Sequence, residues 1–169
     1  MRGACSFAFF AVLMFALCGN CCAQAESPTT SSVETVPTSI ADVHDFLRRT
    51  GHYYLSTVDG DQPRVRPFGT VLLYEGRLYI QTGKKKNVSK QIAKNGKVEL
   101  CAFDGTCWLR LSGILVNDDR REAKAAMLEA YPELQKMYSP DDENTQVLYF
   151  KDATAVFNYF GRPPVTVKF

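Results

Sequence analysis

Alternation of apolar and polar side chains dominates residues 52–160, and this two-residue period is typical of strands with one buried face. Turn pairs that contain glycine, such as Asp59-Gly60 and Asp104-Gly105, separate the alternating runs and indicate hairpins. The predicted strands cover residues 52–58, 64–74, 77–82, 97–103, 106–116, 145–151 and 153–160. Because Pro63 and Pro67 lack a backbone N–H, we expect the second strand to lie partly at a sheet edge or to be interrupted.

Three other segments are predicted as helices. The first begins after Ser39, a suitable N-cap with Asp42 three residues later, and ends near Gly51. Its apolar face carries Ile40, Val43, Phe46 and Leu47. This side of the helix is therefore expected to pack on the strands.

A second, short helix opens at Asn87 or Ser89 and ends at Asn95-Gly96. The pair Asp118-Asp119 is suited to cap a third helix, which Pro132 stops or kinks. The helices fall between hairpins and do not alternate one for one with strands. This order favours a mainly β fold with helices (α+β), an antiparallel barrel, over a parallel doubly wound sheet.

The N-terminus has the layout of a secretory signal peptide, with an apolar run over residues 4–17 and cleavage expected after Ala25. The run is shorter than the roughly 20 residues of a membrane span, so we expect no stable span after cleavage. Residues 26–38 are rich in Ser, Thr and Pro and are predicted to be a flexible linker. Residues 39–169 then form one domain, and the protein is expected to be exported, periplasmic or secreted.

The leader contains four of the six cysteines. Lipid attachment is the less favoured reading of these cysteines, because Leu17 directly precedes Cys18 instead of lying three positions before it. Cys101 and Cys107 remain after cleavage and should lie on opposite faces of a hairpin, which does not indicate a disulfide framework, although a bond between them stays open. The net charge after loss of Arg2 is about +1, so nucleic acid is not expected as a partner.

No catalytic or metal-binding motif stands out. His44 and His52 are not at metal-ligand spacing, and the sequence carries no GxSxG, Walker or GxGxxG motif. The most distinctive chemistry lies at residues 82–87, where a predicted strand delivers three lysines to the start of a helix. Unpaired N–H groups and the helix dipole make such a place suited to a phosphate, although a lysine triplet is more often a solvated turn.

Three segments in order, residues 64–69 (RVRPFG), 78–92 (LYIQTGKKKNVSKQI) and 101–113 (CAFDGTCWLRLSG), resemble small FMN-binding split-barrel proteins of the pyridoxamine 5'-phosphate oxidase-like family. The resemblance covers about residues 40–169. It implies a six-stranded antiparallel split barrel that forms a homodimer and holds FMN in a groove between the two subunits. At residues 161–169 the chain departs from the true oxidases, which continue with basic residues that grip the substrate, so we do not expect vitamin B6 oxidation.

Carried over by position, the resemblance implies the cofactor-binding residues Arg64, Val65, Arg66, Pro67, Gln81, Thr82, Lys85, Lys86, Asn87, Lys90, Trp108 and Arg110. Lys85, Lys86 and Asn87 match the phosphate-binding turn of the family. Trp108 and Arg110 match a strand that faces the partner subunit in this family. Two alternatives stay open: Trp108 as an ordinary barrel or interface aromatic, and Arg66 as the partner of an acidic neighbour.

The resemblance implies an FMN-dependent oxidoreductase-type protein that moves a hydride or electrons to a small-molecule redox partner. A cofactor supplies such chemistry itself, which fits a chain with no evident catalytic side chain. One alternative is a non-catalytic carrier that binds flavin, the deazaflavin F420 or haem. Another is a structural domain that keeps the barrel without a cofactor.

Overall fold

Antiparallel strands make up most of the computed structural model, which describes residues 36–169. The strands are β1 (Tyr53–Asp59), β2 (Gln62–Phe68), β3 (Leu72–Tyr74), β4 (Arg77–Gly83), β5 (Lys97–Phe103), β6 (Cys107–Asp118), β7 (Thr145–Tyr159) and β8 (Arg162–Lys168). The helices are α1 (Ile40–Thr50), α2 (Asn87–Lys94) and α3 (Arg121–Ala130), followed by the 3-10 turn η1 (Pro132–Lys136). The predicted signal peptide and most of the predicted linker lie outside the described residues.

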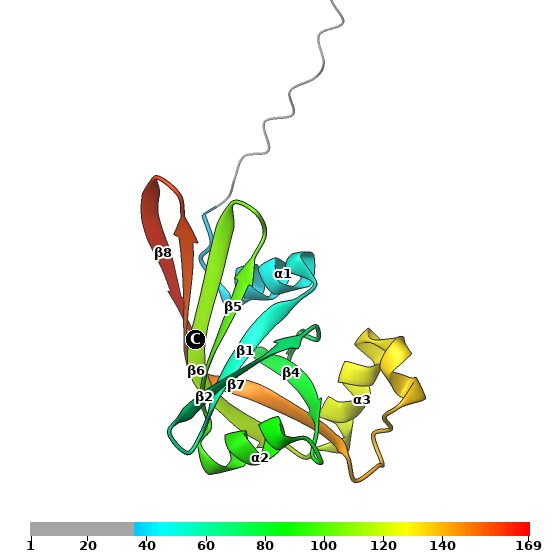
Figure 1. The fold of residues 1–169 in the computed structure, drawn as a ribbon. Coiled ribbons are helices and arrows are strands. Elements are labelled where there is room, and N and C mark those ends of the chain that lie inside the picture. Colours follow the sequence, from blue (N-terminus) through cyan, green and yellow to red (C-terminus); the bar gives the residue numbers. More distant parts are fainter. Residues whose placement is uncertain (1–35) are drawn as a thin grey trace, which may run out of the picture. The chain divides into compact units, whose positions relative to one another are not determined.

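The described strands form one eight-stranded sheet in the order β2-β1-β5-β6-β7-β4-β3, and β8 pairs with β7. Figure 1 shows the sheet curling on itself, with α2 below one end of the strands and α3 beside β4 and β7. This is the expected mainly antiparallel split barrel. It has eight strands instead of six, because the short β3 and the C-terminal β8 add to it.

Predicted strand 64–74 proved to be two strands. β2 lies at the sheet edge and ends at Phe68, and β3 starts at Leu72. The backbone between them bonds to tyrosine hydroxyls: Tyr53 Oη donates to Thr70 O at 2.7 Å, and Tyr131 Oη accepts from Val71 N at 2.8 Å. Since these partners come from distant parts of the chain, the sequence pattern did not show them.

Two predicted strands, 145–151 and 153–160, are instead one strand, β7. Asp152 takes a positive φ of 52° within it, and the register with β6 shifts there, because Asp152 and Ala153 of β7 lie opposite the single residue Gly113 of β6. A Cβ on Gly113 would lie 3.2 Å from the Phe150 ring, so glycine allows the two strands to stay paired there. The predicted strands missed β8, which pairs with the second half of β7.

The predicted helices are confirmed, with one correction at a cap. Ser39 and Asp42 form the expected capping box of α1, and Gly51 follows the helix. Arg120, and not an aspartate, occupies the N-cap of α3. Asp118 is buried at the end of β6, where the Arg120 side chain lowers the pKa of the Asp118 carboxyl.

The barrel core and a smaller cluster under α3 are separate groups of buried side chains. Helix α2 adds Val88 and Ile92 to the barrel core, and α1 adds Val43, Phe46 and Leu47. Among residues 36–169 no helix has the length and apolar character needed to cross a membrane. Cys101 is exposed and Cys107 buried, on opposite faces as predicted, and no disulfide joins them.

Candidate functional site

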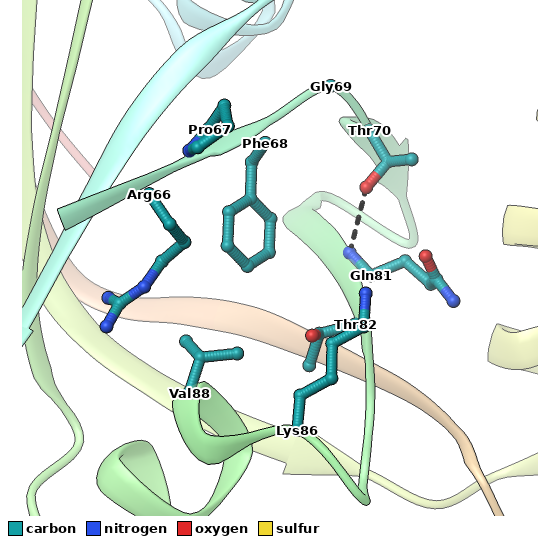
Figure 2. Close-up of a pocket in the computed structure, with 9 residues that line it drawn as sticks. All are labelled: Arg66, Pro67, Phe68, Gly69, Thr70, Gln81, Thr82, Lys86 and Val88. Atoms are coloured by element: carbon teal, nitrogen blue, oxygen red, sulfur yellow. Dashed lines mark hydrogen bonds between the residues drawn. The ribbon is translucent and has the colours of Figure 1, made fainter.

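A cleft of about 210 Å³ opens beside the end of β2, between the backbone that leaves this strand and the start of α2. Figure 2 shows Arg66 and Phe68 projecting from β2 and Val88 from the first turn of α2. The nine lining residues are Arg66, Pro67, Phe68, Gly69, Thr70, Gln81, Thr82, Lys86 and Val88. Five of the twelve predicted cofactor-binding residues are among them: Arg66, Pro67, Gln81, Thr82 and Lys86.

Arg66 holds one edge of its guanidinium against the protein. Its Nη1 donates to Thr57 Oγ1 at 2.8 Å, and its Nη2 donates to Gln91 Oε1 at 2.8 Å. Burial lowers the pKa of Arg66 and repulsion from Arg64 lowers it further, but a guanidinium stays charged in proteins. The acceptors among residues 36–169 are all neutral, so the predicted alternative, an acidic partner for Arg66, is wrong for this part of the chain.

Thr57 and Gln91 lie behind this guanidinium, and the sequence prediction missed both. Thr57 Oγ1 donates to Gln91 Oε1 at 2.6 Å, and both side chains are buried. Each of them is a polar residue at a position where the pattern of its strand or helix calls for an apolar one, and this is the sequence signal that could have identified it. Thr57 continues the inward row of Tyr53 and Leu55 on β1, and Gln91 shares the buried face of α2 with Val88.

The end of β4 carries buried polar atoms without a partner. Thr82 Oγ1 and Gln81 Nε2 have no hydrogen-bond partner among residues 36–169. Figure 2 shows the Thr82 hydroxyl on the side of Phe68, whereas the Gln81 side chain extends to the other side of β4. Gln81 borders the cleft with its backbone, whose N–H donates to Thr70 Oγ1 at 3.1 Å. The Thr82 hydroxyl therefore lies at the wall of the cleft with its hydrogen-bonding capacity unused among the described residues.

The three lysines of the turn between β4 and α2 point to different surroundings. Lys84 Nζ pairs with Asp119 Oδ1 at 2.7 Å, and this hydrogen bond lowers the pKa of Asp119. Lys85 is exposed and does not line the cleft. Lys86 does line it, and its side chain extends toward Thr82 (Figure 2). The solvated-turn alternative thus describes Lys85, while Lys86 contributes a cation to the cleft.

A loop behind this turn holds it in place. Asn144 O accepts from Lys84 N at 2.7 Å, and Asn144 Oδ1 accepts from Lys85 N at 3.1 Å. The loop is organised by Asp142: burial raises the pKa of its carboxyl, but backbone N–H donors, including those of Thr145 and Ser139, outweigh burial and lower the pKa to about 2. The loop reaches the turn because Gly83 has no side chain, since a Cβ there would lie 3.1 Å from Asn144 Oδ1.

Helix α2 presents its first turn to the cleft. Val88 lines the cleft, and the N–H groups of Asn87 and Val88 have no acceptor in the described part of the chain. Unpaired N–H groups at a helix start attract anions. The structure therefore combines a guanidinium, an ammonium, a hydroxyl and a helix N-terminus around one opening.

The other predicted residues do not line the cleft of the single chain. They are Arg64, Val65, Lys85, Asn87, Lys90, Trp108 and Arg110. Val65 is exposed opposite Ser56 on the outer side of the sheet. Arg110 and Trp108 lie on the outer face of β6. Arg110 Nε donates a hydrogen bond to Glu99 Oε1 at 2.6 Å, and the ring centroids of Trp108 and Phe160 are 5.2 Å apart.

The fold and cleft define a class of protein: a small split β-barrel with a cationic cleft at the start of a helix. The family model for pyridoxamine 5'-phosphate oxidase matches residues 40–157, and the chain belongs to this family, which commonly binds flavin. The resemblance drawn from the sequence is thereby confirmed.

Solved structures agree with this assignment. A NimC/NimA family protein from Clostridium acetobutylicum is 43% identical, with a TM-score of 0.75 over 78% of this chain and 92% of that one. General Stress Protein 26 from Bacillus anthracis shares the fold at 16% identity, with a TM-score of 0.60 over 76% and 97% of the two chains. A heme binding protein from Mycobacterium smegmatis does so at 14% identity, with a TM-score of 0.59 over 79% and 60%. A search of curated proteins gave no match.

Proposed function

We propose that this chain binds FMN in the cleft and acts as an oxidoreductase-type protein that passes a hydride or electrons to a small acceptor. The observation that supports it best is the buried, unpartnered hydroxyl of Thr82 in a cleft that also holds the charges of Arg66 and Lys86. A ligand with oxygen atoms and negative charge would satisfy all three groups. Because the chain belongs to a family that commonly binds flavin, a flavin is favoured among ligands of this kind.

The phosphate of FMN suits these residues. A phosphomonoester carries about −1.5 to −2 charge at neutral pH and three strong acceptor oxygens. Arg66 would bind it through two N–H groups, Lys86 as a mobile point charge, and Thr82 through its hydroxyl. The first turn of α2 would add backbone N–H groups. In this assignment the phosphate lies at the α2 end of the cleft, and the ring system lies toward Gly69 and Thr70.

The two alternative cofactors fit the cleft less well. A haem iron takes His, Cys, Met or Tyr as its axial ligand. None of these residue types occurs among the nine residues that line the cleft. F420 joins its phosphate in a diester with one charge, so this phosphate matches Arg66 and Lys86 less well than the phosphomonoester of FMN does. The residues therefore favour FMN.

When bound, the flavin supplies the hydride and electron transfer itself. The chain's residues bind and orient it: Arg66 and Lys86 hold the anionic end, and Phe68 and Val88 form an apolar wall that limits water. The nine lining residues include no carboxylate, imidazole, thiol or phenol, and Lys86 is assigned to the phosphate. We therefore assign no catalytic acid or base to this chain.

A homodimer is part of the proposal. Ligand pockets usually enclose about 300–1,000 Å³, so a cleft of about 210 Å³ in one chain leaves most of a flavin uncovered. Tyr54, Val65 and Phe103 are exposed on the outer face of the sheet, and Phe160 is exposed in the turn between β7 and β8. Such a patch is typical of an interaction surface. A second copy docked there would bring Trp108 and Arg110 toward the flavin.

Titration of the full-length chain with FMN and with riboflavin, which lacks the phosphate, tests the binding site. We expect FMN to bind more tightly, and Lys86→Ala to weaken FMN about tenfold, as the loss of a charge-assisted hydrogen bond predicts. Lys85→Ala is the matched control, because this neighbouring lysine lies outside the cleft. Equal affinities of the two variants for FMN would refute the phosphate assignment.

A second measurement separates enzyme from carrier. The flavin absorbance of the loaded protein should bleach with NADH or NADPH and recover with an added acceptor. A flavin band that no donor bleaches would favour the carrier. The leader predicted at residues 1–25 adds the proposal that this chemistry takes place outside the cytoplasm.

A further inference from the structure

We propose that Thr57 and Gln91 are positioning residues that hold the Arg66 guanidinium ready to receive a phosphate. The inference rests on the proposed function, since it concerns the same cleft. It assigns a role to two buried residues that do not themselves line the cleft. Both belong to elements, β1 and α2, that lie behind Arg66.

The hydrogen bonds form a closed ring of three side chains. Arg66 Nη1 donates to Thr57 Oγ1 at 2.8 Å, Arg66 Nη2 donates to Gln91 Oε1 at 2.8 Å, and Thr57 Oγ1 donates to Gln91 Oε1 at 2.6 Å. A hydroxyl has one proton, so donating it to Gln91 leaves the lone pairs of Thr57 facing Arg66. The ring thereby fixes the end of the guanidinium that carries both terminal nitrogens.

The opposite edge of the guanidinium keeps its donors. Among residues 36–169 no acceptor bonds to Arg66 Nε, and Nη2 makes a single hydrogen bond although it carries two N–H groups. Nε–H and the second N–H of Nη2 lie side by side on the planar group. Two parallel donors are the arrangement with which arginine binds phosphate oxygens.

Neutral partners distinguish Arg66 from Arg110 and Arg120, which pair with carboxylates. Arg110 Nε forms an ion pair with Glu99 Oε1 at 2.6 Å, and Arg120 Nη2 forms one with Asp118 Oδ2 at 2.9 Å. Arg66 is partly buried, yet its acceptors are a hydroxyl, an amide and carbonyl oxygens. A neutral amide at Gln91 orients the charge without cancelling it, so the full attraction stays available to an anionic ligand. A carboxylate at the same position would compete with the ligand.

The substitution Gln91→Glu makes this argument testable in the full-length chain. The new carboxylate can accept the same two hydrogen bonds, so we expect the melting temperature of the ligand-free protein to be retained. Because it also pairs with the Arg66 charge, FMN affinity should fall about 10- to 100-fold. Riboflavin affinity should stay near the wild-type value, since riboflavin has no phosphate. Ala93→Glu adds an equal charge on the exposed side of α2 and should leave both affinities nearly unchanged.

The second variant pair addresses Thr57. Thr57→Val keeps the shape but removes the hydroxyl from the ring, and FMN affinity should fall more than riboflavin affinity. Thr57→Ser restores a hydroxyl and should recover most of the difference. A purely structural role would instead lower both affinities together with the melting temperature.

The outcomes separate this inference from the proposed function. If Arg66→Ala weakens FMN but Gln91→Glu and Thr57→Val do not, the positioning role is overturned and the phosphate site stands. An equal loss of FMN and riboflavin affinity in these variants also overturns it. If Arg66→Ala leaves FMN affinity unchanged, the phosphate assignment fails and the positioning role with it.

Discussion

Replacing Thr82 by valine should stabilise the ligand-free protein and weaken its binding of flavin. Thr82 is 2% exposed, and its buried hydroxyl has no partner among residues 36–169. Burying a hydroxyl without a hydrogen bond costs about 1–3 kcal/mol, and valine has nearly the same shape, so the substitution removes that cost. At about 3 °C per kcal/mol for a chain of this size, the melting temperature should rise by roughly 3–9 °C.

The loss of binding follows from the same hydroxyl. A hydrogen bond to a charged phosphate oxygen contributes about 1.5–3 kcal/mol, so FMN affinity should fall about tenfold or more. Thermal unfolding of the flavin-free chain and titration with FMN measure the two effects separately. We expect stability to rise while FMN affinity falls. A substitution that merely disturbs the fold would instead lower stability and affinity together.

Two matched substitutions serve as controls. Thr57→Val removes a buried hydroxyl that has partners, so it should lower the melting temperature. Thr145→Val removes a fully buried hydroxyl that lies beside the Asp142 carboxylate and does not line the cleft. It should therefore leave FMN affinity unchanged. A lower melting temperature for Thr82→Val, or a higher one with unchanged FMN affinity, would show that this hydroxyl does not bind FMN.

The remaining predictions concern the loop behind the lysine turn and the outer face of the sheet. Asp142 has a pKa lowered from 3.8 to about 2, so its contribution to stability is full above about pH 4 and is lost as the pH falls toward 2. The melting temperatures of wild type and Asp142→Asn should therefore differ most near neutral pH and converge between pH 4 and 2; a constant difference would contradict this. Phe160→Glu, which places a charge beside Trp108, should shift a dimer toward monomers in analytical ultracentrifugation. Met137→Glu is the control, because Met137 is 69% exposed, as Phe160 is at 72%, and a dimer that persists in both variants would exclude the outer face as its interface.

Local rules predicted the helices and most strands well. Ser39 and Asp42 stand at capping-box spacing, and Gly51 closes α1 with a φ of 71°. These features need only neighbours within four residues, so they can be predicted from the sequence. The division of 64–74 into β2 and β3 could not, because the interrupting backbone bonds to Tyr53 and Tyr131 from other parts of the chain.

The candidate site divides in the same way. The lysine turn at the start of α2, with Arg66 in an earlier strand, could be proposed from the sequence, because charge type and helix start are local features. The sequence could not show which lysine faces the cleft. This depends on the ion pair between Lys84 and Asp119 and on the hydrogen bonds from Asn144 to the backbone of Lys84 and Lys85. The sequence specified which groups are available to an anion. Only the packing of β1, β2, β4 and α2 decided that Arg66 and Lys86 meet, and that Thr57 and Gln91 hold Arg66, because these contacts join residues far apart in the chain.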